Sequence, residues 1–359
     1  MSTTNGSPDT GDGDRALLRK ALKAEAPVIF FINGIGDNIL NLPALRALGA
    51  LFAGRASLIC SGSDSLFMFN ELPVKRAIKI RAKISANGRE FDADAVAAET
   101  GNCDLFLSLV PWHSESLTRL VEKLRPQLSV GFISNYDIRM PLNFDQHTSE
   151  LAFDLVRMFD ARSRLQDFTA PPCYPNEARA EARKLREQLN PGAKALAVHA
   201  DTGQKKMWDS VKLMQTLDTF LGLHPEFTVL LVGGRPQSLD CGLYGDRVIP
   251  CYGLPLPVSM ALVTEADFFL GIDSCMLHAA DFAGVPSVGL FGPTSAAEFG
   301  FLVGPHIAIQ APHTMAEIEA TDVADALESL LAEPHQFTVR YLPHRTLKND
   351  NKAYEKSGL

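Results

Sequence analysis

The sequence contains few cysteines, and their spacing gives no reason to pair them. Six cysteines stand at positions 60, 103, 173, 241, 251 and 275, and no two of them form a Cys-x-x-Cys pair. This pattern is typical of neither a zinc site nor a disulfide framework. We therefore expect a reduced protein of the cytoplasm.

Long apolar runs and an excess of positive charge are also missing. No apolar run approaches the ~18 residues that indicate a membrane span, and the formal net charge of −8 argues against general nucleic-acid binding. The start of the chain lacks the basic and apolar segments of a signal peptide. We expect no transmembrane segment and no nucleic-acid partner, and we leave peripheral membrane contact open.

The length of 359 residues exceeds the usual size of one hydrophobic core, which favours two domains. Apolar segments of strand length alternate with helical patterns throughout, which predicts two doubly wound α/β domains facing a central cleft. The expected divisions follow from composition. They are a disordered tail and first helix at 1–25, an N-terminal domain at 26–168, a proline-rich linker at 169–177, a C-terminal domain at 178–332, and a tail at 333–359 that packs back onto the N-terminal domain.

The stretch from 267 to 295 has the clearest local pattern. Residues 268–272 form an apolar run of buried-strand length, and Asp273 and Ser274 are favourable N-cap residues for the helix that follows. Residues 288–291 are the next short strand. This is one βαβ unit, and the helix N-terminus at its open end favours bound phosphate.

A second strand–turn–helix lies near the start of the chain. The apolar strand 28–32 leads into Asn33-Gly34-Ile35-Gly36-Asp37-Asn38, and leucines at helical spacing follow. The glycines allow a tight turn and the close approach of another molecule. Asp37 then stands at a helix N-terminus, where it is either an N-cap or a functional carboxylate.

A third turn of this kind follows the strand 195–198. There Thr202 and Lys206 precede a helix, as in a phosphate cradle. The sequence does not fit the Walker pattern, which makes a P-loop NTPase an unsuitable assignment. Further on, Gly234 follows the apolar strand 227–232 in a turn at the same expected edge.

Together these segments resemble one known family. The motifs are Gly-Asp-x5-Pro-Ala-Leu-Arg (36–46), His-Ala-x-Thr-x3-Lys-x-Trp (199–208) and Asp-Ser-x3-His with Leu-Phe-Gly-Pro-Thr (273–294). In this order they resemble glycosyltransferase family 9, the ADP-heptose heptosyltransferases. The resemblance covers most of residues 28–332 and implies the GT-B fold.

The resemblance also implies roles for residues. Asp37 corresponds to the base that deprotonates the acceptor hydroxyl, and Lys206 stabilises the leaving diphosphate. The donor-binding candidates are Thr202, Asp273, Ser274, Cys275, His278, Gly234 and Thr294, and the acceptor-binding candidates are Asn38, Lys79 and Arg81. No Asp-x-Asp directly follows an expected buried strand, so we expect no metal ion and no cofactor, with the nucleotide sugar as a substrate.

Several alternatives stay open. Lys79 and Arg81 lie on the cationic face of an alternating segment, 78–84, which either protects an exposed strand edge or meets an anionic acceptor of the kind family members bind. His147 is either a ligand-site residue, as in the family's His-x-x-Glu element, or a structural residue beside the capping candidates Thr148 and Ser149. Arg235 either touches the nucleotide or faces solvent.

Three positions depart from the family pattern: Asp201, Gly203 and Cys275. The expected activity is nonetheless inverting, metal-independent transfer of a sugar, heptose from ADP-heptose, to a hydroxyl of a glycan, protein or small molecule. The alternatives are a nucleotide-sugar epimerase of the GT-B type and a degenerate, non-catalytic sugar-nucleotide-binding protein.

Overall fold

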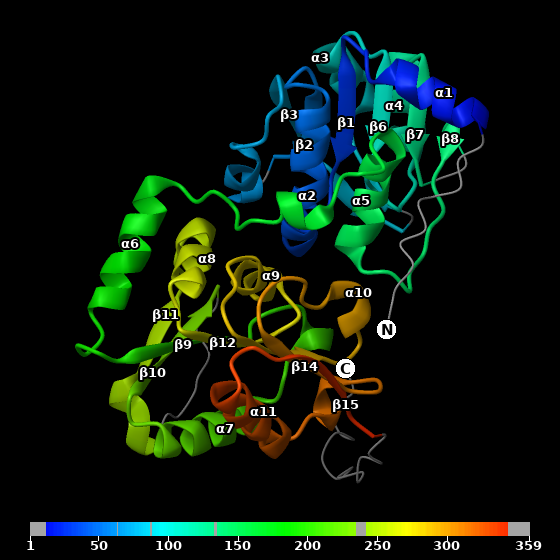
Figure 1. Cartoon of the computed structure of the whole chain (residues 1–359). Helices are drawn as coiled ribbons and strands as arrows, with labels where there is room; N and C mark the ends of the chain where they lie inside the picture. The colour runs from blue at the N-terminus through cyan, green and yellow to red at the C-terminus, as the bar shows by residue number, and fades with distance from the viewer. Residues whose placement is uncertain (1–11, 63, 87, 133–134, 235–241, 344–359) are drawn as a thin grey trace, which may run out of the picture.

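The computed structural model describes residues 12–62, 64–86, 88–132, 135–234 and 242–343. Figure 1 shows two α/β halves, one above the other. Helices α2 (Ile35–Leu51) and α5 (Thr148–Phe159) of the first half lie next to α9 (Cys275–Phe282) and α10 (Ala296–Phe299) of the second. No helix in the described ranges is long and apolar enough to cross a membrane.

Apolar strands build the sheet of the first half, in the order β3-β2-β1-β6-β7-β8. All its neighbouring strands are parallel, and β1 is buried along its whole length because helices cover the sheet. The strands are β1 (Pro27–Phe31), β2 (Ser57–Ser61), β3 (Arg76–Ile80), β6 (Leu105–Ser108), β7 (Leu128–Gly131) and β8 (Ile138–Arg139). The remaining elements of this half are α1 (Asp12–Ala21), η1 (Asp64–Phe69), the hairpin strands β4 (Lys83–Ser85) and β5 (Gly88–Glu90), α3 (Ala93–Thr100), α4 (Glu115–Leu124) and η2 (Leu165–Phe168).

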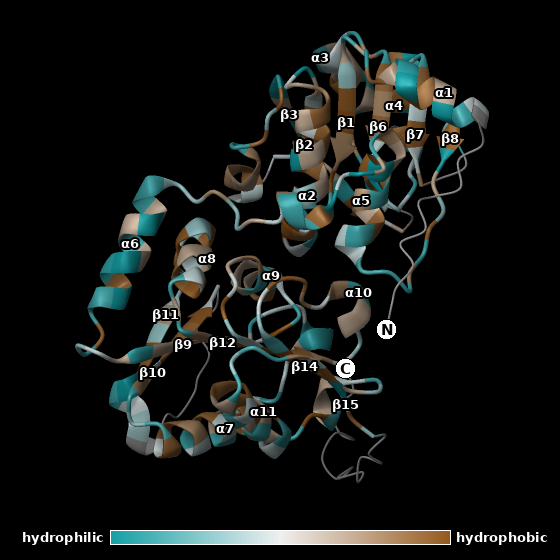
Figure 2. Ribbon diagram, viewed as in Figure 1, coloured by the Kyte–Doolittle hydropathy of each residue, from teal (hydrophilic) through white to brown (hydrophobic). Residues whose placement is uncertain are grey.

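The second half has a parallel sheet in the order β11-β10-β9-β12-β13-β14-β15. Its strands are β9 (Lys194–His199), β10 (Phe227–Gly233), β11 (Val248–Tyr252), β12 (Phe268–Ile272), β13 (Ser287–Phe291), β14 (His306–Gln310) and β15 (Phe337–Tyr341). Its other elements are α6 (Asn176–Glu187), η3 (Gln204–Lys206), α7 (Ser210–Leu223), η4 (Gly242–Arg247), α8 (Leu256–Thr264), η5 (Met315–Glu317) and α11 (Ala320–Ala332). In Figure 2 the central strands are largely brown, whereas α6 is mostly teal, as expected for a helix with one face in solvent.

The strand order places one switch point in each sheet. It reverses between β1 and β6 in the first sheet and between β9 and β12 in the second. Loops that leave the carboxyl ends of two such strands run in opposite directions and leave a crevice, which is where open α/β sheets bind ligands. The two-domain α/β architecture expected from the sequence is confirmed.

The two halves share part of their core. Leu40 and Met68 of the first half and Met260 and Leu277 of the second belong to one buried apolar cluster. Removal of this apolar surface from water favours the association of the halves.

Arg46, the last residue of the first motif, holds the connection between the halves. Its guanidinium donates hydrogen bonds to the carbonyl oxygens of Phe168 at 3.1 Å, Ala170 at 2.7 Å and Pro171 at 2.9 Å. The arginine therefore fixes the end of η2 and the backbone that follows it, which gives this motif position a structural purpose.

The alternating segment 78–84 is not one strand, contrary to the sequence prediction. Ile78 and Ile80 are buried in β3, whereas Ile84 is 81% exposed in the β4–β5 hairpin. The segment spans two strands, β3 and β4, which belong to different sheets. The alternation of apolar and polar residues happens to continue from one strand to the next. β4 and β5 pair as an antiparallel hairpin, and residue 87 between them lies outside the described residues.

The described part of the C-terminal tail corrects a second expectation. Residues 337–341 form β15, which pairs with β14 at the edge of the second sheet instead of returning to the first half. Leu342 packs against the core of the second half. The strand satisfies backbone groups that β14 would otherwise expose at an edge. Residues 344–359, with Tyr354, lie outside the described residues.

A buried carboxyl group ties α9 to the loop before β14. Asp281 is 0% exposed and accepts hydrogen bonds from the backbone N–H groups of Leu302 at 2.8 Å, Val303 at 3.0 Å and Gly304 at 2.8 Å. Burial raises the pKa of Asp281 from 3.8 to about 6, although the three N–H groups lower it. The folded protein therefore binds this proton at pH values where the unfolded chain has lost it.

This predicts a pH-dependent cost for Asp281→Asn. Because the folded-state pKa is raised, the stability that this group contributes is fully present below about pH 4 and falls as pH rises through about 6. The substitution should lower the free energy of unfolding by about 1–3 kcal/mol near neutral pH, and by more near pH 4. Denaturant titrations of both proteins at these pH values would measure the difference, and a cost independent of pH would contradict the prediction.

Candidate active site between the two halves

Asp37 lies in the first turn of α2, directly after the carboxyl end of β1. Its Oδ2 accepts a hydrogen bond from Gly34 N at 3.2 Å, which fixes the carboxylate beside the helix N-terminus. Burial raises the pKa of Asp37, and Asp273 raises it further, whereas the Gly34 N–H, Lys206 and Arg89 lower it. A carboxylate with a raised pKa is a stronger proton acceptor.

Gly36 lies against the start of α9 in the second half. A Cβ at Gly36 would lie 3.4 Å from His278 Cδ2 and 3.8 Å from Cys275 N. A Cβ at this position would make ordinary van der Waals contacts there, so the start of α2 and the start of α9 lie close together.

Asp273 follows β12 and carries a buried carboxyl group in the second half. Its side chain is 5% exposed, and its Oδ2 accepts from Lys206 Nζ at 2.6 Å. His278 Nε2 lies 3.7 Å from Asp273 Oδ1, but burial lowers the pKa of His278 to about 4, so the imidazole is neutral near pH 7. The ion pair of the site is therefore Lys206–Asp273.

A cavity of about 530 Å³, here called the donor cavity, separates these groups. Asp37 lines it from the first half, and Lys206 is the only lysine or arginine among its described lining residues. The second half contributes all of its catalytic and donor-binding candidates: Thr202, Lys206, Gly234, Asp273, Ser274, Cys275, His278 and Thr294. These residues follow β9, β10, β12 and β13, so the switch point of the second sheet brings them together.

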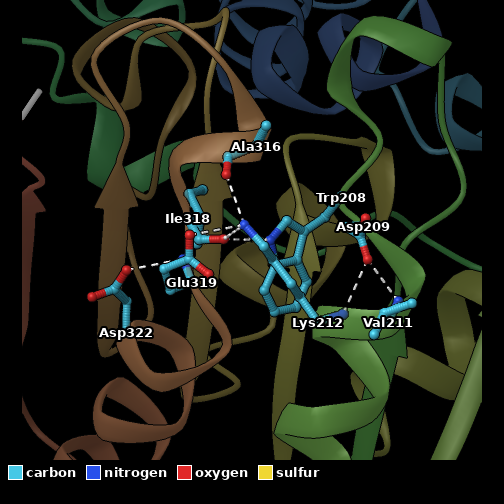
Figure 3. A network of polar contacts seen from close by, with 8 residues as sticks. All are labelled: Trp208, Asp209, Val211, Lys212, Ala316, Ile318, Glu319 and Asp322. Atoms are coloured by element: carbon cyan, nitrogen blue, oxygen red, sulfur yellow. Dashed lines mark hydrogen bonds and ion pairs between the residues drawn. The ribbon is translucent and has the colours of Figure 1, made fainter. Parts of the chain in front are cut away.

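The chain that follows Lys206 is joined to the segment before α11. Trp208 Nε1 donates to Ile318 O at 3.1 Å, and Lys212 Nζ donates to Ala316 O at 2.7 Å and to Glu319 Oε1 at 3.1 Å. Figure 3 shows these bonds joining the start of α7 to the segment before α11. The tryptophan of the second motif, two residues after Lys206, is thus joined to the segment before α11.

Three polar atoms around the donor cavity have no partner of their own. Among the described residues, Ser274 Oγ, His278 Nδ1 and Thr294 Oγ1 are buried without a hydrogen bond, and all three residues line the donor cavity. Ser274 is also the N-cap of α9, yet its side chain makes no capping bond. Buried polar groups are almost always paired in native proteins, so these atoms are candidates for contact with a ligand.

Of the positions that depart from the family pattern, Asp201 has a structural explanation. Asp201 Oδ2 accepts from Gly234 N at 3.1 Å, so this carboxylate joins the loops after β9 and β10. Burial raises the pKa of the Cys275 thiol to about 11, which keeps it protonated and unreactive near pH 7. Gly203 has open space around it, and its departure has no structural explanation.

The structure does not bring the three acceptor candidates to the donor cavity. Asn38 is buried, and its Nδ2 donates to Ser65 Oγ at 2.9 Å, which ties α2 to η1. Lys79 and Arg81 are exposed in and after β3. Arg235 lies outside the described residues.

His147 is the N-cap of α5, a role that the sequence analysis gave to Thr148 or Ser149. Its Nδ1 accepts from Ser149 N at 3.2 Å, and its Nε2 lies 3.2 Å from Gly300 O of the second half. Burial lowers the pKa of His147 to about 4. The neutral ring therefore donates from Nε2 and bridges the two halves.

Sequence reasoning missed the side chains that complete the walls. Leu256, Met276 and Phe299 line the donor cavity, and Glu298 stands beside Phe299 in α10. One sequence signal for this region was available: Ser295 is a favourable N-cap for a short helix directly after the Gly-Pro-Thr turn. That helix turns out to start where Ser295 Oγ accepts from Ala297 N.

Comparison with known proteins identifies the family and the fold. The family model described as glycosyltransferase family 9 (heptosyltransferase) matches residues 135–326, just over half of the chain. No curated protein matches in a sequence search.

Solved structures are similar over most of their length. A glycosyl transferase family 9 structure from Veillonella parvula aligns with a TM-score of 0.71 at 17% identity, covering 86% of this chain and 98% of that one. E. coli heptosyltransferase WaaC with ADP aligns with a TM-score of 0.61 at 18% identity, covering 85% and 99%. E. coli ADP-heptose lps heptosyltransferase II aligns with a TM-score of 0.62 at 14% identity, covering 86% and 99%. These likenesses identify the GT-B fold.

Proposed function

The chain belongs to glycosyltransferase family 9 and is a nucleotide-sugar glycosyltransferase, and we propose that it transfers a heptose from ADP-heptose to an acceptor hydroxyl with inversion and without a metal ion. One observation carries the residue assignment. Asp37 of one half and the Lys206–Asp273 pair of the other line the same donor cavity, which leaves room for a sugar between them.

In the proposed step the acceptor oxygen attacks the anomeric carbon of the donor sugar. The new C–O bond forms as the bond to the diphosphate oxygen breaks, and its electron pair leaves with the diphosphate. The hydroxyl proton passes to the Asp37 carboxylate, which general-base catalysis requires to be ionised and within hydrogen-bond reach. Attack from the face opposite the leaving group inverts the anomeric configuration.

Negative charge then develops on the leaving diphosphate. Lys206 supplies the positive charge, and the open backbone N–H groups at the start of α9 supply preorganised dipoles. Asp273 holds Lys206 in place and binds a sugar hydroxyl, because a direct contact between two anions would be repulsive. Ser274 and Thr294 present the unpaired hydroxyls that the donor would satisfy.

The proposal predicts which nucleotides stabilise the protein. A ligand that binds only the folded form raises the free energy of unfolding by about 2.7 kcal/mol at a concentration one hundred times its Kd. ADP and ADP-heptose should raise the melting temperature in a thermal-shift assay, and UDP and UDP-sugars should not. Stabilisation by the UDP series alone would overturn the choice of donor.

Turnover assays separate the remaining alternatives. A transferase releases ADP only when an acceptor is present, and NMR of the product reports the anomeric configuration. Conversion of a UDP-sugar with no acceptor would instead identify an epimerase, and tight binding without turnover would identify a non-catalytic binding protein. Transfer that is lost in EDTA and restored by a divalent cation would contradict metal independence.

A further inference from the structure

A second cavity, of about 250 Å³, opens beside Asp37 on the side of the first half. Asp37 and Phe299 line both this cavity and the donor cavity, so the two spaces meet at the proposed base. Its other walls include Asn33 after β1, Leu109 after β6 and Phe132 after β7. It therefore occupies the switch point of the first sheet, where a doubly wound sheet binds its ligand.

The walls of this second cavity are mainly apolar and aromatic. Trp112, Phe132 and Phe144 line it, and the Phe144 side chain is 63% exposed. The Trp112 ring is held in place, because its centroid lies 6.0 Å from that of Phe30 in an edge-on arrangement and a Cβ at Gly88 would come within 2.7 Å of its Cε3. Such walls gain most from a ligand with an apolar face, since aromatic side chains bury large areas.

The charges that face the second cavity are negative. Its described lining residues include the carboxyl groups of Asp37 and Glu298 and no lysine, arginine or histidine. Burial raises the pKa of Glu298, and Asp273 and Asp37 raise it further. Arg89 acts on Asp37 from the β4–β5 hairpin but does not line the cavity. An anionic group of a ligand bound in this cavity would be repelled by the carboxylates of Asp37 and Glu298.

Resting on the proposed function, we infer that this second cavity binds the apolar body of an uncharged acceptor and presents its hydroxyl to Asp37. This differs from the anionic acceptor that the family resemblance and the cationic residues Lys79 and Arg81 suggested. Those two side chains lie outside both cavities. Specificity then comes from aromatic contact on one side and from carboxylate repulsion of anionic competitors on the other.

Three matched glycosides test the inference on the full chain. Phenyl β-glucoside carries an apolar body without charge, methyl β-glucoside lacks that body, and phenyl β-glucuronide adds one carboxylate. Saturation-transfer NMR in the presence of ADP measures their binding without any chemistry. We expect phenyl β-glucoside to bind at least about tenfold more tightly than the glucuronide and more tightly than the methyl glycoside.

Two variants and one control variant locate the effect. Phe144→Ala should weaken phenyl β-glucoside binding roughly threefold to tenfold, whereas Phe337→Ala should not change it. Phe337 is a matched control because it is 62% exposed and lies on β15, away from the cavity. Glu298→Gln should reduce the discrimination against the glucuronide, since it removes one of the two facing charges.

The results of this test are separable from those of the proposed function. If the donor assays fail but phenyl β-glucoside still binds through Phe144, the transferase step is rejected and the inferred ligand class is kept. Preference for the glucuronide would overturn the inference, and its loss in Lys79→Ala or Arg81→Ala would locate the anionic site at those residues. The absence of detectable phenyl β-glucoside binding would also overturn it.

Discussion

Replacing Asp37 by asparagine should lower the rate of sugar transfer by about a hundredfold to ten-thousandfold, the range expected for loss of a general base. The amide has nearly the same shape, and its oxygen still accepts the hydrogen bond from Gly34 N that fixes the native side chain. The fold and donor affinity should therefore stay unchanged. Steady-state kinetics gives the loss in kcat, and calorimetry with ADP gives the donor affinity.

The pH profile provides a second test of Asp37. Burial raises the pKa of this carboxyl group, so the acidic limb of kcat/KM should lie at a higher pH than an ordinary aspartate would give. Activity falls as pH decreases through that limb because the protonated base accepts no proton. Residual activity of Asp37→Asn should lack the limb.

The matched control for this substitution is Asp209→Asn. Asp209 is also an aspartate at a helix start, where it accepts from Val211 N and Lys212 N, but it does not line the donor cavity. This variant should keep its transfer rate. Normal turnover by Asp37→Asn, with donor still bound, would contradict the assignment of Asp37 as the general base.

Replacing Lys206 by alanine should have the second large effect. Removal of one preorganised group that stabilises developing charge typically costs about 10²–10³ in kcat, and Lys206 is the only lysine or arginine among the described residues that line the donor cavity. The substitution also leaves Asp273 buried without its 2.6 Å partner, which adds a repulsive charge near the diphosphate. Both kcat and ADP affinity should therefore fall.

Lys205→Ala is the control for Lys206→Ala, because the neighbouring lysine has the same chemistry but is exposed and does not line the donor cavity. Its kinetics and ADP affinity should stay close to those of the native protein. The double substitution Lys206→Ala with Asp273→Asn should recover part of the lost ADP affinity, because it removes the uncompensated anion. Unchanged donor affinity and turnover in Lys206→Ala would contradict the assignment.

Much of the local structure was predictable because each strand–turn–helix carries its own signals. The run 268–272 followed by Asp273 and Ser274 predicted β12 and the start of α9, and both are present. The prediction of one strand over 78–84 was wrong because alternation of apolar and polar residues does not indicate which sheet a strand joins. The prediction that the tail packs on the first half was wrong for residues 337–341. Their pairing with β14 depends on a sheet edge that exists only in the folded protein.

The site was predictable where a motif stands directly after a strand and not elsewhere. Thr202 and Asp273 follow β9 and β12, so sheet topology alone brings them to one edge. Asn38 points into the first half because the helix turns it about 100° away from its neighbour Asp37, and its amide bonds to Ser65. Trp112 and Phe144 carry no motif, and only the packing around Asp37 identifies them.

The sequence by itself determined the family, the α/β alternation and which residues of the second half line the larger cavity, because these depend on short-range patterns and on the order of strands along the chain. Only the tertiary structure decided that Asp37 and Lys206 share one cavity, that Asp273 neutralises Lys206, and that the neighbouring cavity is aromatic and anionic. Those properties depend on distances between segments far apart in the chain, and charge and burial act through distance in space.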